Sequence, residues 1–232
     1  MRHGFGEAPF NPLPTVVWAL ALPIIASELV FGLGQVGLAS GGFGLRSQAL
    51  ELSAYPPEMV LQMWQHQIVM WDQLYRIVSY PFVHYGLTHA AFVVVFTLAL
   101  GKVMAGIFRP FGLLVLFFGS AIGAALIYTL IAGLMPQTRF QPLVGGYPAV
   151  YGFVGAFTFL LWARLAATGG PRMRAFSLIG MLLGFQLVFA LVFGEAGTTW
   201  IADLSGFVTG FGLSFFLVPG GTARVREALR QR

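Results

Sequence analysis

The sequence contains no cysteine, and only 9% of its 232 residues are charged. The absence of cysteine excludes disulfide bonds, thiolate metal ligands and cysteine nucleophiles. Scarce charge, 57% hydrophobic residues and a mean hydropathy of +0.80 are atypical of a water-soluble domain and indicate an integral membrane protein. The net charge of +5 does not predict nucleic-acid binding, because the basic residues lie at the ends of apolar runs and are not interleaved with aromatic residues.

Six apolar runs are long enough to cross a bilayer as helices, since about 20 apolar residues span the hydrocarbon core. They lie near residues 13–33, 89–108, 111–134, 148–168, 175–194 and 199–218. We therefore expect an all-α, polytopic membrane protein with six transmembrane helices in a single domain, residues 1–218, followed by a basic cytoplasmic tail at 219–232.

A long connection, residues 34–88, separates the first two runs. Its double proline, Pro56 and Pro57, precedes a segment in which methionine and tryptophan interrupt polar residues. This pattern predicts a short helix, either at the membrane interface with tryptophan at headgroup depth or packed on the protein as a lid.

The distribution of arginine and lysine predicts the orientation, because cytoplasmic loops are enriched in both. With both termini in the cytoplasm, three basic residues, Arg46, Arg76 and Arg139, lie outside. The ten that lie inside are Arg2, Lys102, Arg109, Arg164, Arg172, Arg174, Arg224, Arg226, Arg230 and Arg232. We therefore expect cytoplasmic N and C termini, and the short six-span form favours a bacterial inner membrane.

Two acidic residues, Glu28 and Asp203, fall within or at the ends of the apolar runs, where charge is costly and often functional. Asp203 shares a helix face with Gly206 and Gly210, and the two glycines form a small-xxx-small pattern that permits close helix approach. The alternative for Asp203 is simple contact with interfacial water, and for Glu28 we expect that contact.

Neither the histidines nor the serines form a recognisable reactive site. The histidines are His3, His66, His84 and His89; His84 and His89 are five residues apart, with no carboxylate at ligand spacing, so no metal site or cofactor is expected. The serines within the spans lack the exposed, glycine-flanked setting and the paired histidine that a nucleophile needs. They are Ser27, Ser120, Ser177, Ser205 and Ser214.

Three segments occur in the order, and on the predicted helices, of one known family. The segment "ADLSGFVTG" at 202–210 is similar to Ala-His-x-x-Gly-x-x-x-Gly, and "GGYPAVYGFVGAF" at 145–157 is similar to Gly-x-Ser-Gly-Ala-x-x-Gly. The segment "YRIVSYPFVHYGLTHAAFV" at 75–93 is similar to one that ends in His-x-x-x-Asn. Together they resemble the rhomboid family of intramembrane serine proteases, and the resemblance implies a six-helix rhomboid-like bundle.

At the family's catalytic positions the sequence departs from this pattern. By the resemblance, the serine nucleophile aligns with Tyr147, the glycine after it with Pro148, and the histidine base with Asp203. His89 is retained, but the accompanying asparagine is replaced by Val93. A phenol with a pKa near 10 facing a carboxylate is not a comparable nucleophile–base pair. We therefore expect a pseudoprotease without catalytic residues, in which Tyr147 either hydrogen-bonds Asp203 or points alone into a water-filled cavity.

The resemblance extends to inactive rhomboids and Derlins, which bind transmembrane clients without cleaving them. It implies binding of transmembrane client or partner proteins in the bilayer, at the gate between the second and fifth spans. The predicted client-binding or packing residues are Phe92, Phe96, Phe185, Phe189, Phe193, Gly206 and Gly210. Lipid-facing phenylalanines are the alternative. Other functions that stay open are a structural subunit of a larger membrane complex, a serine endopeptidase that uses Ser205 or Ser120, and, more weakly, a transporter.

Overall fold

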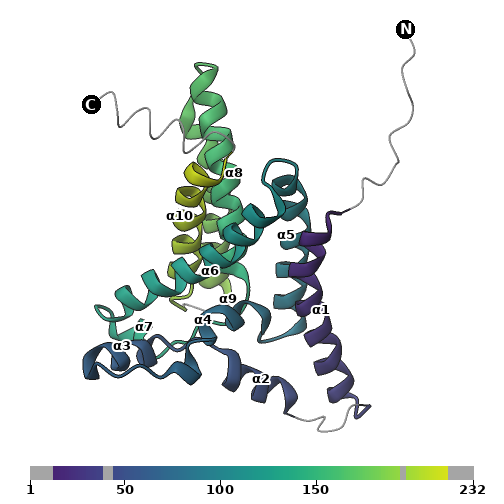
Figure 1. Cartoon of the computed structure of the whole chain (residues 1–232), viewed down its shortest axis with the longest axis vertical. Coiled ribbons are helices and arrows are strands. Elements are labelled where there is room, and N and C mark those ends of the chain that lie inside the picture. Colours follow the sequence, from purple (N-terminus) through teal and green to yellow (C-terminus); the bar gives the residue numbers. More distant parts are fainter. Residues whose placement is uncertain (1–12, 39–43, 194–196, 219–232) are drawn as a thin grey trace.

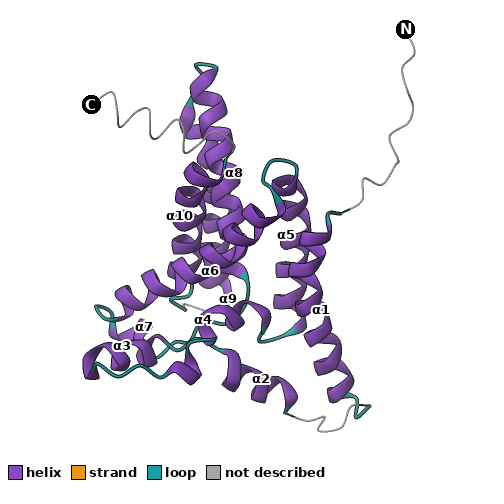
Figure 2. Ribbon diagram, viewed as in Figure 1, coloured by secondary structure: helices purple, strands orange, loops and turns teal. Residues whose placement is uncertain are grey.

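The computed structural model describes residues 13–38, 44–193 and 197–218, and these residues are almost entirely helical (Figures 1 and 2). The long helices are α1 (Thr15–Gln35), α5 (Leu87–Ala105), α6 (Pro110–Ala132), α8 (Tyr147–Ala167), α9 (Ser177–Phe193) and α10 (Trp200–Leu217). The short ones are α2 (Leu45–Ser53), α3 (Pro57–His66), α4 (Arg76–Ser79) and α7 (Pro136–Arg139), with 3-10 turns η1 (Trp71–Gln73), η2 (Tyr80–Phe82) and η3 (Arg172–Phe176). The β-structure of the described residues is a single bridge between Tyr55 and Leu143.

Five of these helices, α1, α5, α6, α8 and α10, are long and apolar enough to cross a membrane. The protein is therefore an integral membrane protein. Helix α9 is also apolar but has 17 residues. All six long helices begin and end within one helical turn of the apolar runs expected from the sequence. The expected basic tail, residues 219–232, lies outside the described residues.

Helix α8 lies at the centre of the bundle, with α10 and α6 packed along it and α1 beside α5 (Figure 1). Its first half is buried from Pro148 to Ala156, whereas most residues of its second half are partly or fully exposed. The core between α6 and α8 is aromatic and aliphatic, with Phe117 against Phe153 at a ring-centroid distance of 5.9 Å. Helix α8 is thus the central helix of the bundle, and the neighbouring helices pack against it.

The connection between α1 and α5 contains α2, α3 and α4, which gather at one end of the bundle (Figure 1). The hydroxyl of Tyr75 donates a hydrogen bond to the carbonyl oxygen of Leu52 at 2.6 Å. The guanidinium of Arg76 donates to the carbonyl oxygens of Glu51 at 2.6 Å and Ala54 at 3.0 Å. These bonds satisfy carbonyls that the end of α2 leaves without helical partners, so Tyr75 and Arg76 hold that helix in place.

Glu28 of α1 is buried and forms an ion pair with Arg46 of α2. Both guanidinium nitrogens of Arg46 lie 2.8 Å from the carboxylate oxygens, and one of them also donates to the carbonyl oxygen of His84 at 2.9 Å. Because a buried carboxylate is unfavourable without a partner, the chain supplies one from the next helix. The expectation that Glu28 contacts only interfacial water is therefore wrong.

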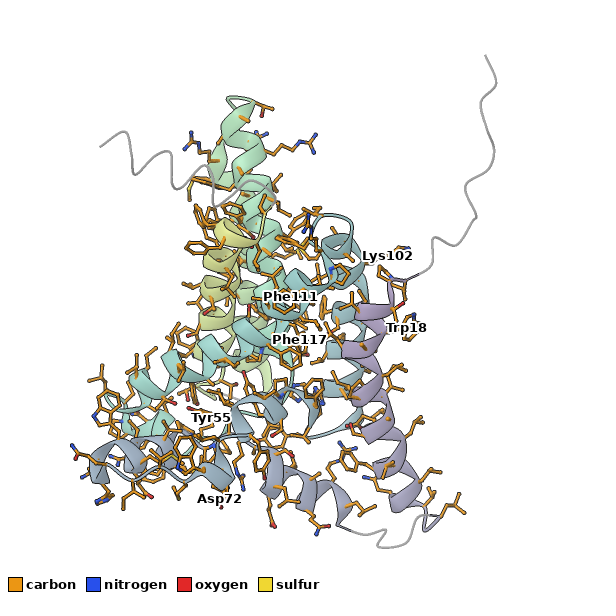
Figure 3. The ribbon with its side chains drawn as sticks, in the orientation of Figure 1. Trp18, Tyr55, Asp72, Lys102, Phe111 and Phe117 are labelled. Carbon is orange, nitrogen blue, oxygen red and sulfur yellow. The ribbon has the colours of Figure 1, made fainter. Side chains whose placement is uncertain are left out.

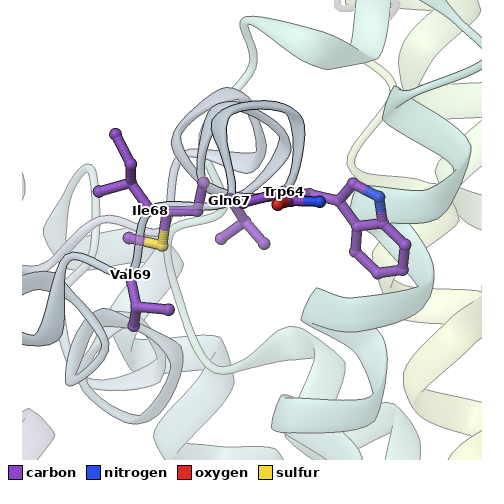
Figure 4. Close-up of a pocket in the computed structure, with 6 residues that line it drawn as sticks. Trp64, Gln67, Ile68 and Val69 are labelled. Carbon is purple, nitrogen blue, oxygen red and sulfur yellow. The ribbon is translucent and has the colours of Figure 1, made fainter.

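The helix expected after the double proline is α3, which begins at Pro57, where a missing N–H has no cost. Its Trp64 is 82% exposed and lines an open cavity of about 480 Å³ (Figure 4) and a second one of about 310 Å³. Trp71 is 78% exposed. Helix α3 thus turns its tryptophan outward, while Met63 on the same helix is buried and Val60 packs on the core, so both the interfacial helix and the lid stay predictions.

Candidate functional site

The site begins with the turn that leads into α8. Gly145 has φ of +95°, a conformation that favours glycine, and a Cβ there would lie 2.6 Å from the His89 imidazole. A Cβ at Gly146 would lie 2.7 Å from a methyl group of Val93. Two glycines therefore allow the start of α8 to lie directly against α5, which carries His89 and Val93.

His84 fixes this turn from the other side. Its Nε2 accepts a hydrogen bond from the backbone N–H of Gly146 at 3.3 Å, and its side chain is fully buried. Burial lowers the pKa of His84 to about 3, and nearby His89 and Arg46 lower it further in the same direction. The imidazole is therefore neutral at physiological pH, as an acceptor of an N–H must be.

Tyr147 opens α8 and covers His89. The two rings are stacked, with centroids 4.9 Å apart and planes at 20°. Tyr85, on the loop before α5, lies roughly parallel to the same imidazole at 6.4 Å. The phenol ring also packs against the apolar residues Val93 and Val150, so it is held by contacts on several sides. The Tyr147 ring thus covers one face of the His89 imidazole.

Asp203, in the first turn of α10, faces α9. It is 5% exposed, and its carboxylate accepts a hydrogen bond from the side-chain amide of Gln186 at 2.8 Å. Among the described residues the hydroxyl of Tyr147 makes no hydrogen bond, so the expected Tyr147–Asp203 pair is not formed. The alternative, in which Tyr147 points alone into a water-filled cavity, stays a prediction for the hydroxyl, while the ring itself is stacked on His89. The amide of α9 reaches the carboxylate, while the phenol turns toward α5.

Glycines bring α8 and α10 into backbone contact and so set the distance between Tyr147 and Asp203. A Cβ at Gly206 would lie 2.0 Å from the carbonyl oxygen of Pro148. A Cβ at Gly210 would lie 2.1 Å from the carbonyl oxygen of Gly152. Side chains are excluded at these points, which is the close approach that small-xxx-small patterns permit.

The phenylalanines singled out from the sequence lie on α5 and α9. Phe92 and Phe96 of α5 stack on each other at 6.5 Å, and Phe92 is 52% exposed. Phe185 of α9 is 63% exposed. The side chains of Phe189 and Phe193 lie outside the described residues. The described members of this set therefore present aromatic surface on the outside of the bundle.

Both serines considered as substitute nucleophiles, Ser120 and Ser205, are buried. Ser120 is fully buried between α6 and α8, where a Cβ at Gly152 would lie 2.1 Å from its hydroxyl oxygen. The hydroxyl of Ser205 donates to the carbonyl oxygen of Ile201 at 2.7 Å. Neither hydroxyl is hydrogen-bonded to a histidine, which a serine nucleophile needs as its base.

The described residues do not gather three histidine, aspartate or glutamate side chains that could hold a metal ion. What the site contains instead is a neutral histidine, a stacked Tyr147–His89 pair and a carboxylate bound to an amide. These groups can position helices and offer an aromatic surface. They do not pair a nucleophile with a base.

Sequence reasoning missed three residues that shape the site: His84, Gln186 and Arg46. Gln186 carries a signal, because it is the one amide in the apolar run 177–193. His84 was weighed only as a metal ligand, and nothing in its spacing indicates that it binds the backbone of Gly146. Arg46 lies in a connection without helical periodicity, so its pairing with Glu28 could not be foreseen.

Comparison with family models matches residues 71–220 to the rhomboid domain. The match covers more than half of the chain and includes α5 to α10 together with the turn that carries His84. Comparison with curated proteins gives no match.

Proposed function

Because the chain belongs to the rhomboid family, we propose that it is a catalytically inactive member, a rhomboid pseudoprotease that binds transmembrane client or partner proteins without cleaving them. The observation that carries this proposal is the stacking of Tyr147, at the position of the family's serine, onto His89. The ring fills the place where a nucleophile would meet a peptide bond.

Physical chemistry supports the loss of hydrolysis. A serine becomes a nucleophile when a base within hydrogen-bond reach removes its proton, and the resulting oxyanion needs donors. Asp203, at the position of the base, accepts a hydrogen bond from Gln186 and none from Tyr147. Val93 stands where the family has asparagine and offers no donor, and Pro148 has no backbone N–H. Nucleophile, base and oxyanion support are thus lost together.

The proposal includes the arrangement in the membrane. Helix α9 is the sixth span of a single domain, residues 1–218, and the connection 36–86 joins the first two spans. Both termini lie in the cytoplasm, since this orientation places most of the basic residues inside. The membrane we propose is a bacterial inner membrane.

The client-binding surface is proposed at the gate between α5 and α9. Phe92 and Phe185 supply exposed aromatic area there, with the half-buried Phe96 stacked on Phe92, and aromatic side chains contribute much of the energy of protein interfaces. A client helix on this surface exchanges lipid contacts for aromatic packing. It does not enter the space in front of His89, which Tyr147 fills.

The first experiment measures cleavage. The natural protein and a variant with Tyr147→Ser and Asp203→His are reconstituted in vesicles with a fluorescent single-span substrate, beside an active rhomboid protease as positive control. We expect no cleavage by the natural protein, and none by the variant, because Val93 and Pro148 still deny the oxyanion its donors. Cleavage by the natural protein would contradict the proposal.

The second experiment maps binding with a photo-crosslinking amino acid in native membranes. It is placed at Phe92 on the proposed gate or, as control, at Phe111 on α6, which is 75% exposed. We expect discrete membrane-protein adducts from position 92 and lipid adducts from position 111. Equal protein capture from both positions would contradict a client site at the gate. Copurification of one fixed set of proteins at constant stoichiometry would instead identify a subunit of a membrane complex.

A further inference from the structure

Charge is separated along the length of the described molecule. Lys102, Arg109, Arg164, Arg172 and Arg174 lie at one end, on the last turns of α5 and α8, before α6 and in η3. The carboxylates of the described residues are on other parts of the chain: Glu28, Glu51, Glu58, Asp72 and Asp203. Figure 3 shows Lys102 near one end of the molecule and Asp72 at the opposite end. One end of the bundle is therefore purely basic within the described residues.

These cations have no carboxylate partners among the described residues, unlike two of the three arginines at the opposite end. There, Arg46 pairs with Glu28 and Arg139 with Glu58. No ion pair of the described chain includes Arg164, Arg172 or Arg174, and all three side chains are exposed. Their charge is thus available to an external anion.

The three arginines surround the turn between α8 and η3, which projects beyond the neighbouring helices (Figure 1). The guanidinium of Arg172 lies over the ring of Trp162 in α8, 5.4 Å from its centroid. Tryptophan side chains concentrate at the headgroup depth of membranes, where the ring is in apolar surroundings and the N–H is in polar ones. Trp162 therefore places Arg172 at the level where lipid phosphates lie.

We propose that this α8–η3 basic surface, defined by Arg164, Arg172 and Arg174, binds the phosphate headgroups of anionic phospholipids. A guanidinium donates two parallel hydrogen bonds to phosphate oxygens, and the planar fork of Arg172 is already oriented by Trp162. An anionic leaflet attracts each basic residue near its surface by about 1 kcal/mol. The inference is independent of the proposed client binding, because none of its residues lies at the gate between α5 and α9.

The test compares binding of phosphatidylglycerol and phosphatidylcholine to the full-length protein in detergent, by native mass spectrometry. We expect the natural protein to prefer phosphatidylglycerol. The variant Arg172→Gln with Arg174→Gln should lose about fivefold of this preference per arginine, the ratio that corresponds to ~1 kcal/mol each. Arg172→Lys with Arg174→Lys keeps the charge and should retain most of the preference.

Two controls make the result specific. Arg139→Gln removes one cation from the opposite end and should leave the lipid preference unchanged, and melting temperatures verify that each variant is folded. Inorganic phosphate at the lipid concentration should not displace phosphatidylglycerol, because the lipid also has apolar contacts. The proposal is overturned if the natural protein binds both lipids equally, if the glutamine variants keep the preference, or if phosphate competes as well as the lipid.

Discussion

Helix α10 packs against α8 and α9 in two very different ways. Toward α8, a Cβ at Gly206 or Gly210 would lie about 2 Å from a backbone oxygen, so the two helices touch through their main chains. Toward α9, a hydrogen bond from Gln186 to Asp203 joins the two helices, and Gly180 and Gly184 of α9 lie on an exposed face, where a Cβ would meet no described atom within 4 Å. Glycine thus lies in a tight main-chain contact on α10 and on an open helix face on α9.

This difference separates a rigid part of the fold from a part that can rearrange. Main-chain contact between α8 and α10 tolerates no change in spacing, since any shift would bring backbone atoms into overlap or open a gap. The described contact of α9 includes apolar side chains such as Ile179 and the amide–carboxylate bond between Gln186 and Asp203. If a partner helix is accommodated anywhere in this fold, movement of α9 has the smaller energetic cost.

The largest expected effect comes from adding one methyl group at the α8–α10 contact. Gly206→Ala should destabilise the protein by about 1 to 3 kcal/mol or more, because the new Cβ overlaps the carbonyl oxygen of Pro148. Gly180→Ala on α9 is the matched control and should be neutral or stabilising by up to about 1 kcal/mol, since alanine favours helix. Thermal unfolding in detergent measures both. Equal shifts for the two variants would remove the distinction between the contacts.

The link between α9 and α10 gives the next effect. Gln186→Leu leaves the Asp203 carboxylate buried without a donor and should cost about 1 to 3 kcal/mol. Replacing both residues by leucine should cost much less, because no unpaired polar group is left. A double-mutant cycle of unfolding free energies detects this difference. Additive losses would show that the two side chains act independently.

The stability of the folded protein should depend on pH through His84, which binds the turn before α8. In the unfolded chain this histidine binds a proton near pH 6.5, whereas the folded protein, with a pKa of about 3, does not. The folded state thus binds fewer protons between these values, and stability should fall as the pH drops through this window, by at most about 1.4 kcal/mol per pH unit. His84→Asn offers Gly146 an acceptor that does not titrate and should flatten the unfolding profile measured against pH. An unchanged profile would assign the dependence to other groups.

The smallest effect is expected for the hydroxyl of Tyr147. Tyr147→Phe keeps the ring on His89 and removes an oxygen without a hydrogen-bond partner among the described residues, so stability should change by less than about 0.5 kcal/mol. Tyr147→Ala removes the stacked ring as well, and its larger loss of stability is the reference value. If Tyr147→Phe lowers the free energy of unfolding by more than about 1 kcal/mol, the hydroxyl makes a stabilising polar interaction and this prediction is wrong.

Much of the helical arrangement could be predicted because it depends on length and hydropathy. The limits of α6 and α8 coincide with Pro110 and Pro148, which start helices well and continue them badly. The close contact between α8 and α10 could be expected from the spacing of Gly206 and Gly210. These signals are local, so no knowledge of distant partners is needed to interpret them.

The pairing of polar groups was less predictable, because each group can form its hydrogen bond with any of several nearby partners. Asp203 has Tyr147 on one side and Gln186 on the other, and its bond goes to the amide. Glu28 is joined to an arginine 18 residues away, in a stretch without periodic pattern. Such choices are settled by the relative positions of three helices, which one sequence does not determine.

The bridge between Tyr55 and Leu143 has a consequence for how the protein is assembled. Two backbone hydrogen bonds, of 3.0 and 2.8 Å, join the connection before α5 to the turn before α8, and the N–H of Gly145 adds a third to the carbonyl oxygen of Tyr80. These bonds enclose α5 and α6 in one loop of the chain. During synthesis these hydrogen bonds cannot form until both helices have been made and Leu143 has left the ribosome. The turn that places Tyr147 on His89 therefore reaches this bonded arrangement only after α5 and α6 have been made, whereas α9 and α10 are added to it later.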